Sequence, residues 1–149
     1  MGNRKADDTP PGLRSKWKVL IVDDVQDLRD SFRELLEGEG YEVLEAANGR
    51  TALDILRSSR YPLVVLLDMM MPLMSGDSVI DTLIRERALP GKHVIVLLTA
   101  SPATVPRAIQ SALEKYQIEV TRKTISLDEL LALVEQAQER ITFQQGQPR

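Results

Sequence analysis

The stretch LVVLLDMMMPLMSG, residues 63–76, decides the fold. Its first five residues are all apolar, which is typical of a strand buried on both faces inside a parallel sheet. The apolar run ends on Asp68, and Pro72 and Gly76 then mark a loop. In an open α/β sheet, ligands bind at the carboxyl ends of the strands. Asp68 is therefore either a placed reactive group or an ordinary polar strand end, and other residues are needed to decide between them.

Composition favours one globular domain and excludes several kinds of site. The 149 residues are 43% hydrophobic and 28% charged, and the net charge of −3 gives no general attraction to nucleic acid or anionic membrane. The chain has no cysteine, which excludes disulfides and cysteine-ligated metals. Its single histidine, His93, excludes a multi-histidine metal site, and we expect it to be structural or exposed. With no signal peptide and no apolar run long enough to span a membrane, we expect a cytoplasmic protein.

Strand and helix patterns alternate five times along the chain. Strands are expected at residues 18–22, 41–46, 63–67, 93–98 and 118–122. The segments after each strand carry apolar residues at helical spacing, and Ser126-Leu127-Asp128-Glu129 has the form of a capping box before the last helix. The pattern predicts a doubly wound, flavodoxin-like α/β fold whose five-stranded parallel sheet has the order 2-1-3-4-5.

Three segments are expected from the distribution of polar residues. Residues 1–15 are predicted to be a disordered arm, because they cannot bury enough apolar area to offset the entropy of ordering. Residues 16–141 are predicted to form the folded domain, and residues 142–149 a flexible tail. Because the tail leaves no room for an effector domain, we expect a stand-alone domain.

In the predicted strand order, the first and third strands are neighbours, so Asp23, Asp24 and Asp68 would crowd one edge of the sheet. Two like charges about 4 Å apart repel by roughly 4 kcal/mol at an effective dielectric constant near 20. The carboxylates must therefore hold protons, bind a cation, or both. Oxygen ligands suit Mg²⁺ rather than zinc. Thr99 would add a hydroxyl and Lys123 a positive charge, a set suited to attack by a carboxylate on phosphorus.

With these residues in this order, the chain resembles the receiver domain of two-component response regulators from about residue 18 to residue 140. The motifs are Val-Asp-Asp after the first strand, Asp-Met-Met-Met-Pro-Leu-Met-Ser-Gly after the third, Thr-Ala after the fourth and Lys after the fifth. Because a stand-alone domain is expected, the resemblance is to chemotaxis regulators that stand alone.

The resemblance implies a phosphoacceptor and its metal ligands. Asp68 would receive a phosphoryl group from a sensor histidine kinase or a phosphotransfer protein. Asp24, Asp68 and the backbone carbonyl of Met70 would bind Mg²⁺, with Asp23 acting through water. Phosphorylation of Asp68 and loss of that phosphate are the only reactions implied, so we do not expect an enzyme that acts on other substrates.

The resemblance also assigns the groups around the phosphoryl site. Thr99 and Lys123 would hold phosphoryl oxygens, and Ala100 would be small enough to admit them. Met70 and Ser101 occupy the positions that tune dephosphorylation in the family. Because neither side chain orients an attacking water well, the phosphorylated state is expected to be moderately long-lived.

Two departures from the family pattern lie at the fifth strand. The family usually has Lys-Pro with a cis bond where this chain has Lys123-Thr124, and a cis bond before a non-proline costs about 3–4 kcal/mol, so this loop is expected to be strained or reshaped. The family's aromatic switch residue is replaced by Val120. A downstream partner is therefore expected to read the face made by the fourth helix, fifth strand and fifth helix through the position of the fourth helix. Arg122 could replace Lys123 only after a register slip.

Three classes of function could use a carboxylate at this place in the fold. The first is the phosphorylated receiver, and the second is an interaction module of the same fold that works without phosphorylation, which the altered fifth strand would permit. The third, a phosphatase of the haloacid dehalogenase type, needs a second acid where this chain has Met70, so we discount it. A second copy of the chain, forming a homodimer, stays among the candidate partners.

Overall fold

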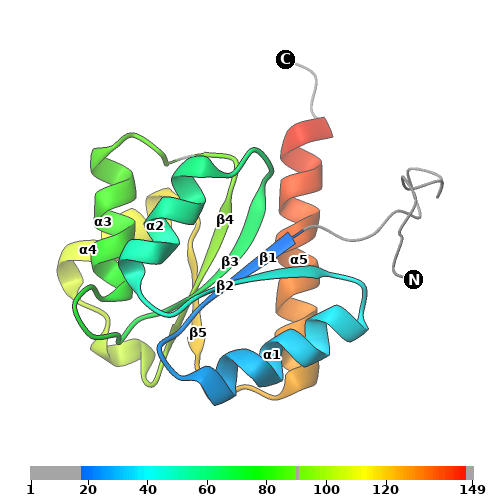
Figure 1. Cartoon of the computed structure of the whole chain (residues 1–149). Coiled ribbons are helices and arrows are strands. Elements are labelled where there is room, and N and C mark those ends of the chain that lie inside the picture. Colours follow the sequence, from blue (N-terminus) through cyan, green and yellow to red (C-terminus); the bar gives the residue numbers. More distant parts are fainter. Residues whose placement is uncertain (1–17, 90, 147–149) are drawn as a thin grey trace.

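The computed structural model describes residues 18–89 and 91–146 (Figure 1). The arm predicted for residues 1–15 and the last three residues of the predicted tail lie outside the described residues. Among the described residues, no helix has the length and apolar character needed to cross a membrane.

Five parallel strands form one sheet in the order β2-β1-β3-β4-β5, as the sequence predicts. The strands are β1 (Lys18–Val22), β2 (Glu42–Ala46), β3 (Leu63–Asp68), β4 (Val94–Thr99) and β5 (Glu119–Arg122). Every residue of β3 and of β4 is buried, in agreement with the apolar runs that predicted them. β5 is an edge strand with exposed and half-buried residues, which explains its more polar sequence.

Helices cover both faces of the sheet (Figure 1). They are α1 (Gln26–Gly38), α2 (Gly49–Ser58), α3 (Gly76–Arg85), α4 (Arg107–Lys115) and α5 (Leu127–Gly146), with a short 3₁₀ helix, η2 (Pro102–Thr104), before α4. Alternate strand residues point to opposite faces. Leu20 and Val22 pack in the core under α2, α3 and α4, whereas Val19 and Ile21 pack in the core under α1 and α5. The fold is therefore the predicted three-layer arrangement.

The capping box before α5 is confirmed. The backbone N–H of Glu129 donates to Oγ of Ser126 at 3.0 Å, and the backbone N–H of Ser126 donates to the Glu129 carboxylate at 2.9 Å. The C-terminal end of α5 was not expected, because the helix continues to Gly146, into the segment predicted as a tail. Residues 127–145 contain neither proline nor glycine, so nothing in this stretch stops the helix before Gly146.

The start of α4 is set by proline. Pro106 has no N–H and disfavours a helical conformation of the residue before it, and Val105 is accordingly extended, with φ −66° and ψ 126°. The chain therefore leaves β4 through η2 and begins α4 only at Arg107.

Candidate phosphoryl-acceptor site

Three carboxylates meet where β1 and β3 end. These strands are parallel neighbours, with Val22 paired to Leu67, so the residues that follow, Asp23 and Asp68, lie side by side. Ligand oxygens from Asp23, Asp24 and Asp68 all lie within 4.8 Å of one another. The side chains of Asp23 and Asp68 are buried, at 1% and 2% exposed, whereas Asp24 is exposed. The structure thus brings together the three acids that the sequence singled out.

The turn after β1 is held by several hydrogen bonds. Asp23 donates its backbone N–H to the carbonyl of Ala46 at 3.1 Å, and its Oδ1 accepts from the N–H of Val25 at 2.8 Å. The guanidinium of Arg29, on α1, donates to the backbone carbonyl of Asp23 at 2.7 Å and to the carboxylate of Glu45 at 2.9 Å. These contacts fix the backbone that carries the acidic pair.

The loop after β3 is anchored just as closely. The N–H of Met69 donates to the carbonyl of Leu98, and the N–H of Gly76 donates to the carbonyl of Met69, both at 2.8 Å. A Cβ atom at Gly76 would lie 2.5 Å from the carbonyl oxygen of Asp68, so only glycine fits this approach. The N–H of Met70 donates to Oδ1 of Asp68 at 3.3 Å, while the Met70 side chain is 69% exposed.

Lys123 reaches the acids from the end of β5. Its Nζ donates to Oδ2 of Asp68 at 3.1 Å and lies 3.0 Å from Oδ2 of Asp23. Its backbone N–H donates to the carbonyl of Thr99 at 2.7 Å, which fixes the chain beside the end of β4. Arg122 is exposed, whereas Lys123 contacts the acids without any register slip.

Thr99 ends β4, and its side chain is buried, at 1% exposed. Its hydroxyl donates to the carbonyl of Ser101 at 3.2 Å and accepts from the N–H of Ser101 at 3.3 Å. In the described part of the chain, this hydroxyl makes no hydrogen bond to Asp68 or Lys123. Ala100 is exposed at the same edge of the sheet. Thr99 therefore ends a strand at the same edge of the sheet as the acids, but its hydroxyl bonds to the backbone of its own loop.

Burial and the neighbouring groups together set the pKa values of Asp68 and Lys123. Burial, followed by the charge of Asp23, raises the pKa of Asp68, although Lys123 and the Met70 N–H oppose this. Burial lowers the pKa of Lys123, but its contacts with the carboxylates of Asp23 and Asp68 outweigh this effect, so the pKa is raised overall. The ammonium is thereby kept charged, and the carboxyl of Asp68 is the group that is costly to ionise.

The acidic group is compatible with Mg²⁺. One lysine faces three carboxylates, so negative charge is in excess. Oδ2 of Asp23 is buried and has the ion pair with Lys123 but no hydrogen bond, so it lacks part of its coordination. Because the donors are all oxygens, a hard cation is the ion that they suit.

The comparisons with known proteins agree with this geometry. The response regulator receiver domain family matches residues 19–135. The chain belongs to this family. Receiver domains are typically signalling modules rather than enzymes, and they interact with histidine kinases or phosphotransfer proteins.

Two curated relatives illustrate the extent of the similarity. Sporulation initiation phosphotransferase F of Bacillus subtilis is 41% identical over 83 residues, which are 56% of this chain and 64% of that protein. Response regulator MprA of Mycolicibacterium vanbaalenii is 35% identical over 129 residues, which are 87% of this chain and 53% of that protein. The receiver chain spans between about a third and two thirds of the length of the curated relatives it matches.

Solved structures show the same fold. A CheY-like receiver domain protein from Methanospirillum hungatei has a TM-score of 0.71 and 29% identity, with 88% of this chain and 98% of that chain covered. The response regulator TrrA from Thermotoga maritima, solved in complex with Mg²⁺ and BeF, has a TM-score of 0.63 and 32% identity, with 80% and 97% covered.

A hollow beside β5 surrounds the residue that stands where the family's aromatic switch was expected. Val120, on β5, is half-buried and lines a hollow of about 310 Å³ between α4 and β5. The hollow is also lined by Pro102 and Val105 from the segment after β4, and no aromatic side chain of the described residues lines it. The hollow beside Val120 is therefore not filled by an aromatic ring of the described residues.

Sequence reasoning missed two residues that shape this receiver site. Arg29 was not singled out, although it holds the carbonyl of Asp23, and Gly76 was noted only as a loop marker, although its lack of a Cβ lets the loop approach Asp68. Arg29 could have been found from its place about one turn into the helix that follows Asp23 and Asp24. Glu45, on the neighbouring strand, is its ion-pair partner.

Proposed function

We propose that this receiver accepts a phosphoryl group on Asp68 from a phosphohistidine of a sensor kinase or a phosphotransfer protein, with Mg²⁺ as cofactor. The observation that carries the proposal is the pairing of Lys123 Nζ with the buried carboxylates of Asp68 and Asp23, at 3.1 Å and 3.0 Å. A cation held against a buried carboxylate is a pre-built site for phosphoryl oxygens. Phosphorelay signalling in the cytoplasm is part of this proposal.

The reaction follows from the positions of the side chains. A carboxylate oxygen of Asp68 attacks phosphorus, the bond from phosphorus to the donor imidazole breaks, and the imidazole leaves with the electron pair and takes a proton from water. The ammonium of Lys123 then pairs with a phosphoryl oxygen in place of the carboxylate of Asp68. Asp24, Asp68 and the Met70 carbonyl would hold Mg²⁺, with Asp23 acting through water, and the ion would neutralise charge on the phosphoryl oxygens.

The signal would leave the site through Thr99. A phosphoryl group on Asp68 would offer the Thr99 hydroxyl a stronger, charged acceptor than the carbonyl of Ser101 that it now uses. Admission of the group past Ala100, which is small and exposed, requires no core rearrangement. Release of Ser101 would move η2 and the start of α4, and a protein partner would read this change on the face made by α4, β5 and α5.

Intact mass after incubation with acetyl phosphate and Mg²⁺ tests the proposal. The wild-type chain should gain one phosphoryl group, and Asp68→Asn should gain none. Asp30→Asn serves as the matched control, because Asp30 is exposed on α1 and outside the acidic group. A phosphorylated Asp68→Asn variant, or a wild-type chain that is never labelled, would refute the assignment.

The alternative is an interaction module that binds its partner without phosphorylation, and Val120 is the observation that favours it. With no ring to move on β5, the partner face could hold one conformation in both states. Partner binding that is equal for the wild type, with and without phosphodonor, and for Asp68→Asn would support this alternative.

A further inference from the structure

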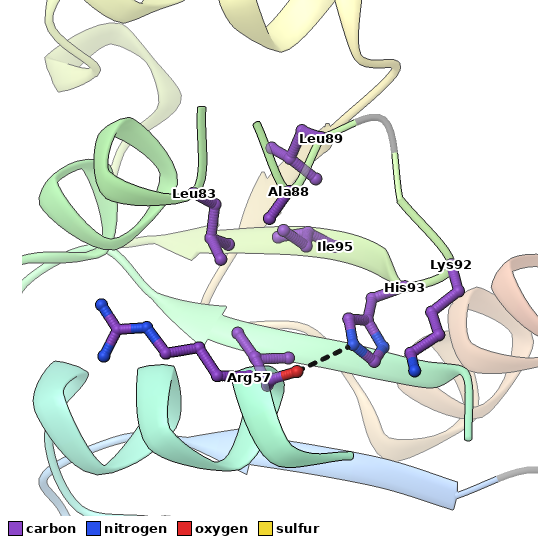
Figure 2. Close-up of a pocket in the computed structure, with 8 residues that line it drawn as sticks. Arg57, Leu83, Ala88, Leu89, Lys92, His93 and Ile95 are labelled. Atoms are coloured by element: carbon purple, nitrogen blue, oxygen red, sulfur yellow. Dashed lines mark hydrogen bonds between the residues drawn. The ribbon is translucent and has the colours of Figure 1, made fainter. Parts of the chain in front are cut away.

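A second cavity lies between α2, α3 and the start of β4 (Figure 2). It is at the edge of the sheet where β4 begins, opposite the edge where Thr99 ends that strand and the acids gather. Its volume of about 340 Å³ is in the range of small-molecule sites. The cavity is therefore separate from the phosphoryl-acceptor site and large enough to hold a ligand.

The walls of the cavity are mainly apolar. Leu56 from α2, Leu83 from α3 and Ile95 from β4 are all at most 5% exposed and belong to the main hydrophobic core. Leu89, which follows α3, is half-buried and packs against the same core, and Ala88 lies beside it at the mouth (Figure 2). An apolar group that enters the cavity would thus be removed from water on several sides.

His93 forms part of the wall and is not free to bind a ligand. Its Nδ1 accepts from the backbone N–H of Leu63 at 3.0 Å, so the proton lies on Nε2, which is 3.3 Å from the carbonyl oxygen of Leu56 and donates to it. Both ring nitrogens are therefore used, as expected for a structural histidine, and the ring is neutral.

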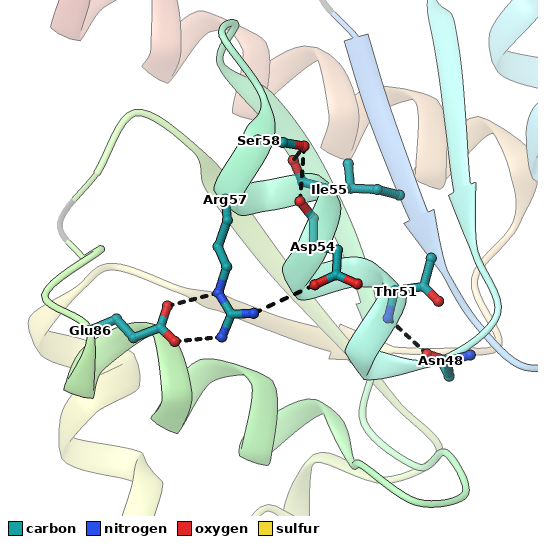
Figure 3. A network of polar contacts seen from close by, with 7 residues as sticks. All are labelled: Asn48, Thr51, Asp54, Ile55, Arg57, Ser58 and Glu86. Atoms are coloured by element: carbon teal, nitrogen blue, oxygen red, sulfur yellow. Dashed lines mark hydrogen bonds and ion pairs between the residues drawn. The ribbon is translucent and has the colours of Figure 1, made fainter.

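Arg57 lines the cavity but its charge is already balanced. Its guanidinium forms a bidentate pair with Glu86, beyond the end of α3, and a second ion pair with Asp54 at 3.6 Å (Figure 3). The same pairing joins α2 to α3 across one side of the cavity. Arg57 therefore braces the two helices and offers little positive charge to a ligand.

Lys92 is the cation that is left at the mouth. It is exposed, and its Nζ donates to the backbone carbonyl of Ser59 at 2.6 Å. An ammonium has three donors, and among the described residues this is the one hydrogen bond that Nζ of Lys92 donates. Within residues 18–89 and 91–146, no carboxylate pairs with Lys92. The described residues thus give the cavity an apolar interior and, at its exposed side, one positive charge that no carboxylate among them balances.

We propose that this cavity binds a small amphipathic carboxylate, whose apolar chain fills the interior and whose carboxylate pairs with Lys92. The class of ligand follows from the two features together. A cation would be repelled by Lys92, and a neutral apolar molecule would leave the ammonium without the partner that the carboxylate supplies. This binding is independent of the phosphorylation of Asp68.

Amide spectra of the full chain during titration with straight-chain carboxylates test the proposal. Butanoate, hexanoate and octanoate should bind with increasing affinity, because each added methylene enters the apolar interior. Shifts should be concentrated at Leu56, Leu83 and Ile95, with the amides at Asp68 and Thr99 unmoved. Hexylamine and hexanol, of matched length, should bind clearly more weakly than hexanoate.

Two variants locate the site. Lys92→Gln should weaken hexanoate binding roughly threefold, because Lys92 is exposed and an ion pair at an exposed site is screened by water. Ala88→Leu should abolish it by filling the mouth, and Ala88 is exposed, so the core is not disturbed. The control is Lys115→Gln, an exposed lysine on α4 outside the cavity, which should leave binding unchanged.

Three outcomes would overturn the proposal. They are the absence of saturable shifts with every carboxylate, binding of hexylamine or hexanol as tight as that of hexanoate, and hexanoate binding that Ala88→Leu leaves intact. The comparison of hexanoate with hexylamine and hexanol uses the wild-type chain alone, so it decides the question even where a variant folds poorly.

Discussion

Nζ of Lys123 lies 3.1 Å from Oδ2 of Asp68, and this pair joins the end of β5 to the end of β3 across β4. The lysine side chain is 23% exposed and the aspartate side chain 2% exposed, so the pair is largely shielded from water. Removing one partner of a shielded ion pair costs more than removing a surface charge, because the other charge stays buried. In this site, two buried carboxylates depend on the same ammonium.

We therefore expect Lys123→Ala to lower the free energy of unfolding by about 2 kcal/mol, below the range for a fully buried pair because the lysine is partly exposed. Urea denaturation without Mg²⁺ measures the change. Lys123→Arg keeps the charge and should lose less, and the double variant with Asp68→Asn should recover part of the loss. A Lys123→Ala variant as stable as the wild type would show that the pair has no structural role.

Mg²⁺ should stabilise the folded chain by binding to the native state, where the three carboxylates are held together. The melting temperature should rise with millimolar Mg²⁺, and Asp24→Asn should remove most of the rise. Asp24 is exposed, so the substitution itself should leave the fold intact, and Asp30→Asn on α1 is the control. A wild-type chain whose melting temperature is indifferent to Mg²⁺ would mean that the acids hold no metal.

The lifetime of the phosphorylated state should depend on residue 70. The Met70 side chain is exposed beside the acceptor and cannot hydrogen-bond an attacking water usefully. Met70→Asn should therefore speed the loss of phosphate from Asp68, measured by intact mass over time after the donor is removed. Met70→Leu, which is also apolar, should decay like the wild type. If Met70→Asn decays no faster than the wild type, this residue does not tune the reaction.

The sheet and the acidic group could be predicted because both depend on local sequence patterns. The buried run that ends at Asp68 predicts a central parallel strand, and parallel strands place their carboxyl ends at one edge, which brings Asp23 beside Asp68. The place of Lys123 after the fifth strand could be read from the sequence, although β5 has no buried residue and its register is therefore specified less strongly than that of β3 or β4. These parts of the site are consequences of periodicity and topology.

The contacts of Arg29 and the cavity at Lys92 depend on tertiary structure, which produces no periodic pattern in the sequence. The hydrogen bond from Arg29 to the carbonyl of Asp23 joins a helix side chain to a loop backbone, and arginine at an exposed helix position has many other uses. The cavity at Lys92 likewise requires α2, α3 and β4 to be placed in three dimensions. The start of α4 at Arg107, by contrast, can be read from Pro106, because the effect of proline on the preceding residue is local.

The route from the phosphoryl site should run through the loop after β4. Because the Thr99 hydroxyl bonds both the N–H and the carbonyl of Ser101, a pull on this hydroxyl moves η2 and the start of α4. Val120 is small and stiff at χ1, so β5 should stay passive. With beryllofluoride and Mg²⁺, amide shifts should be large at residues 101–105 and small at residues 118–120. Large shifts at residues 118–120 with residues 101–105 unmoved would show that the route is wrong.

The last prediction concerns pH and the hydrogen bonds of His93. Burial, and then the charge of Lys92, lowers the pKa of His93, although the bond to Leu56 opposes this. In the unfolded chain the imidazole titrates near pH 6.5, so below this value the unfolded state binds the proton more readily than the folded state. The stability that neutral His93 provides is therefore present above about pH 6.5 and is lost as the pH falls. Protonation would also place a proton on Nδ1, which now accepts from the N–H of Leu63.

The His93→Gln variant isolates this effect, because its amide can accept from Leu63 and donate to Leu56 but does not titrate. The raised pKa of Asp68 has the opposite sign, since its contribution to stability is lost as the pH rises, so the wild-type curve alone mixes the two groups. We expect the free energy of unfolding of the wild type to fall relative to that of His93→Gln between about pH 8 and about pH 5.5, measured by urea denaturation. Parallel curves for the two chains would mean that His93 is not held neutral by the contacts that join α2, β3 and β4.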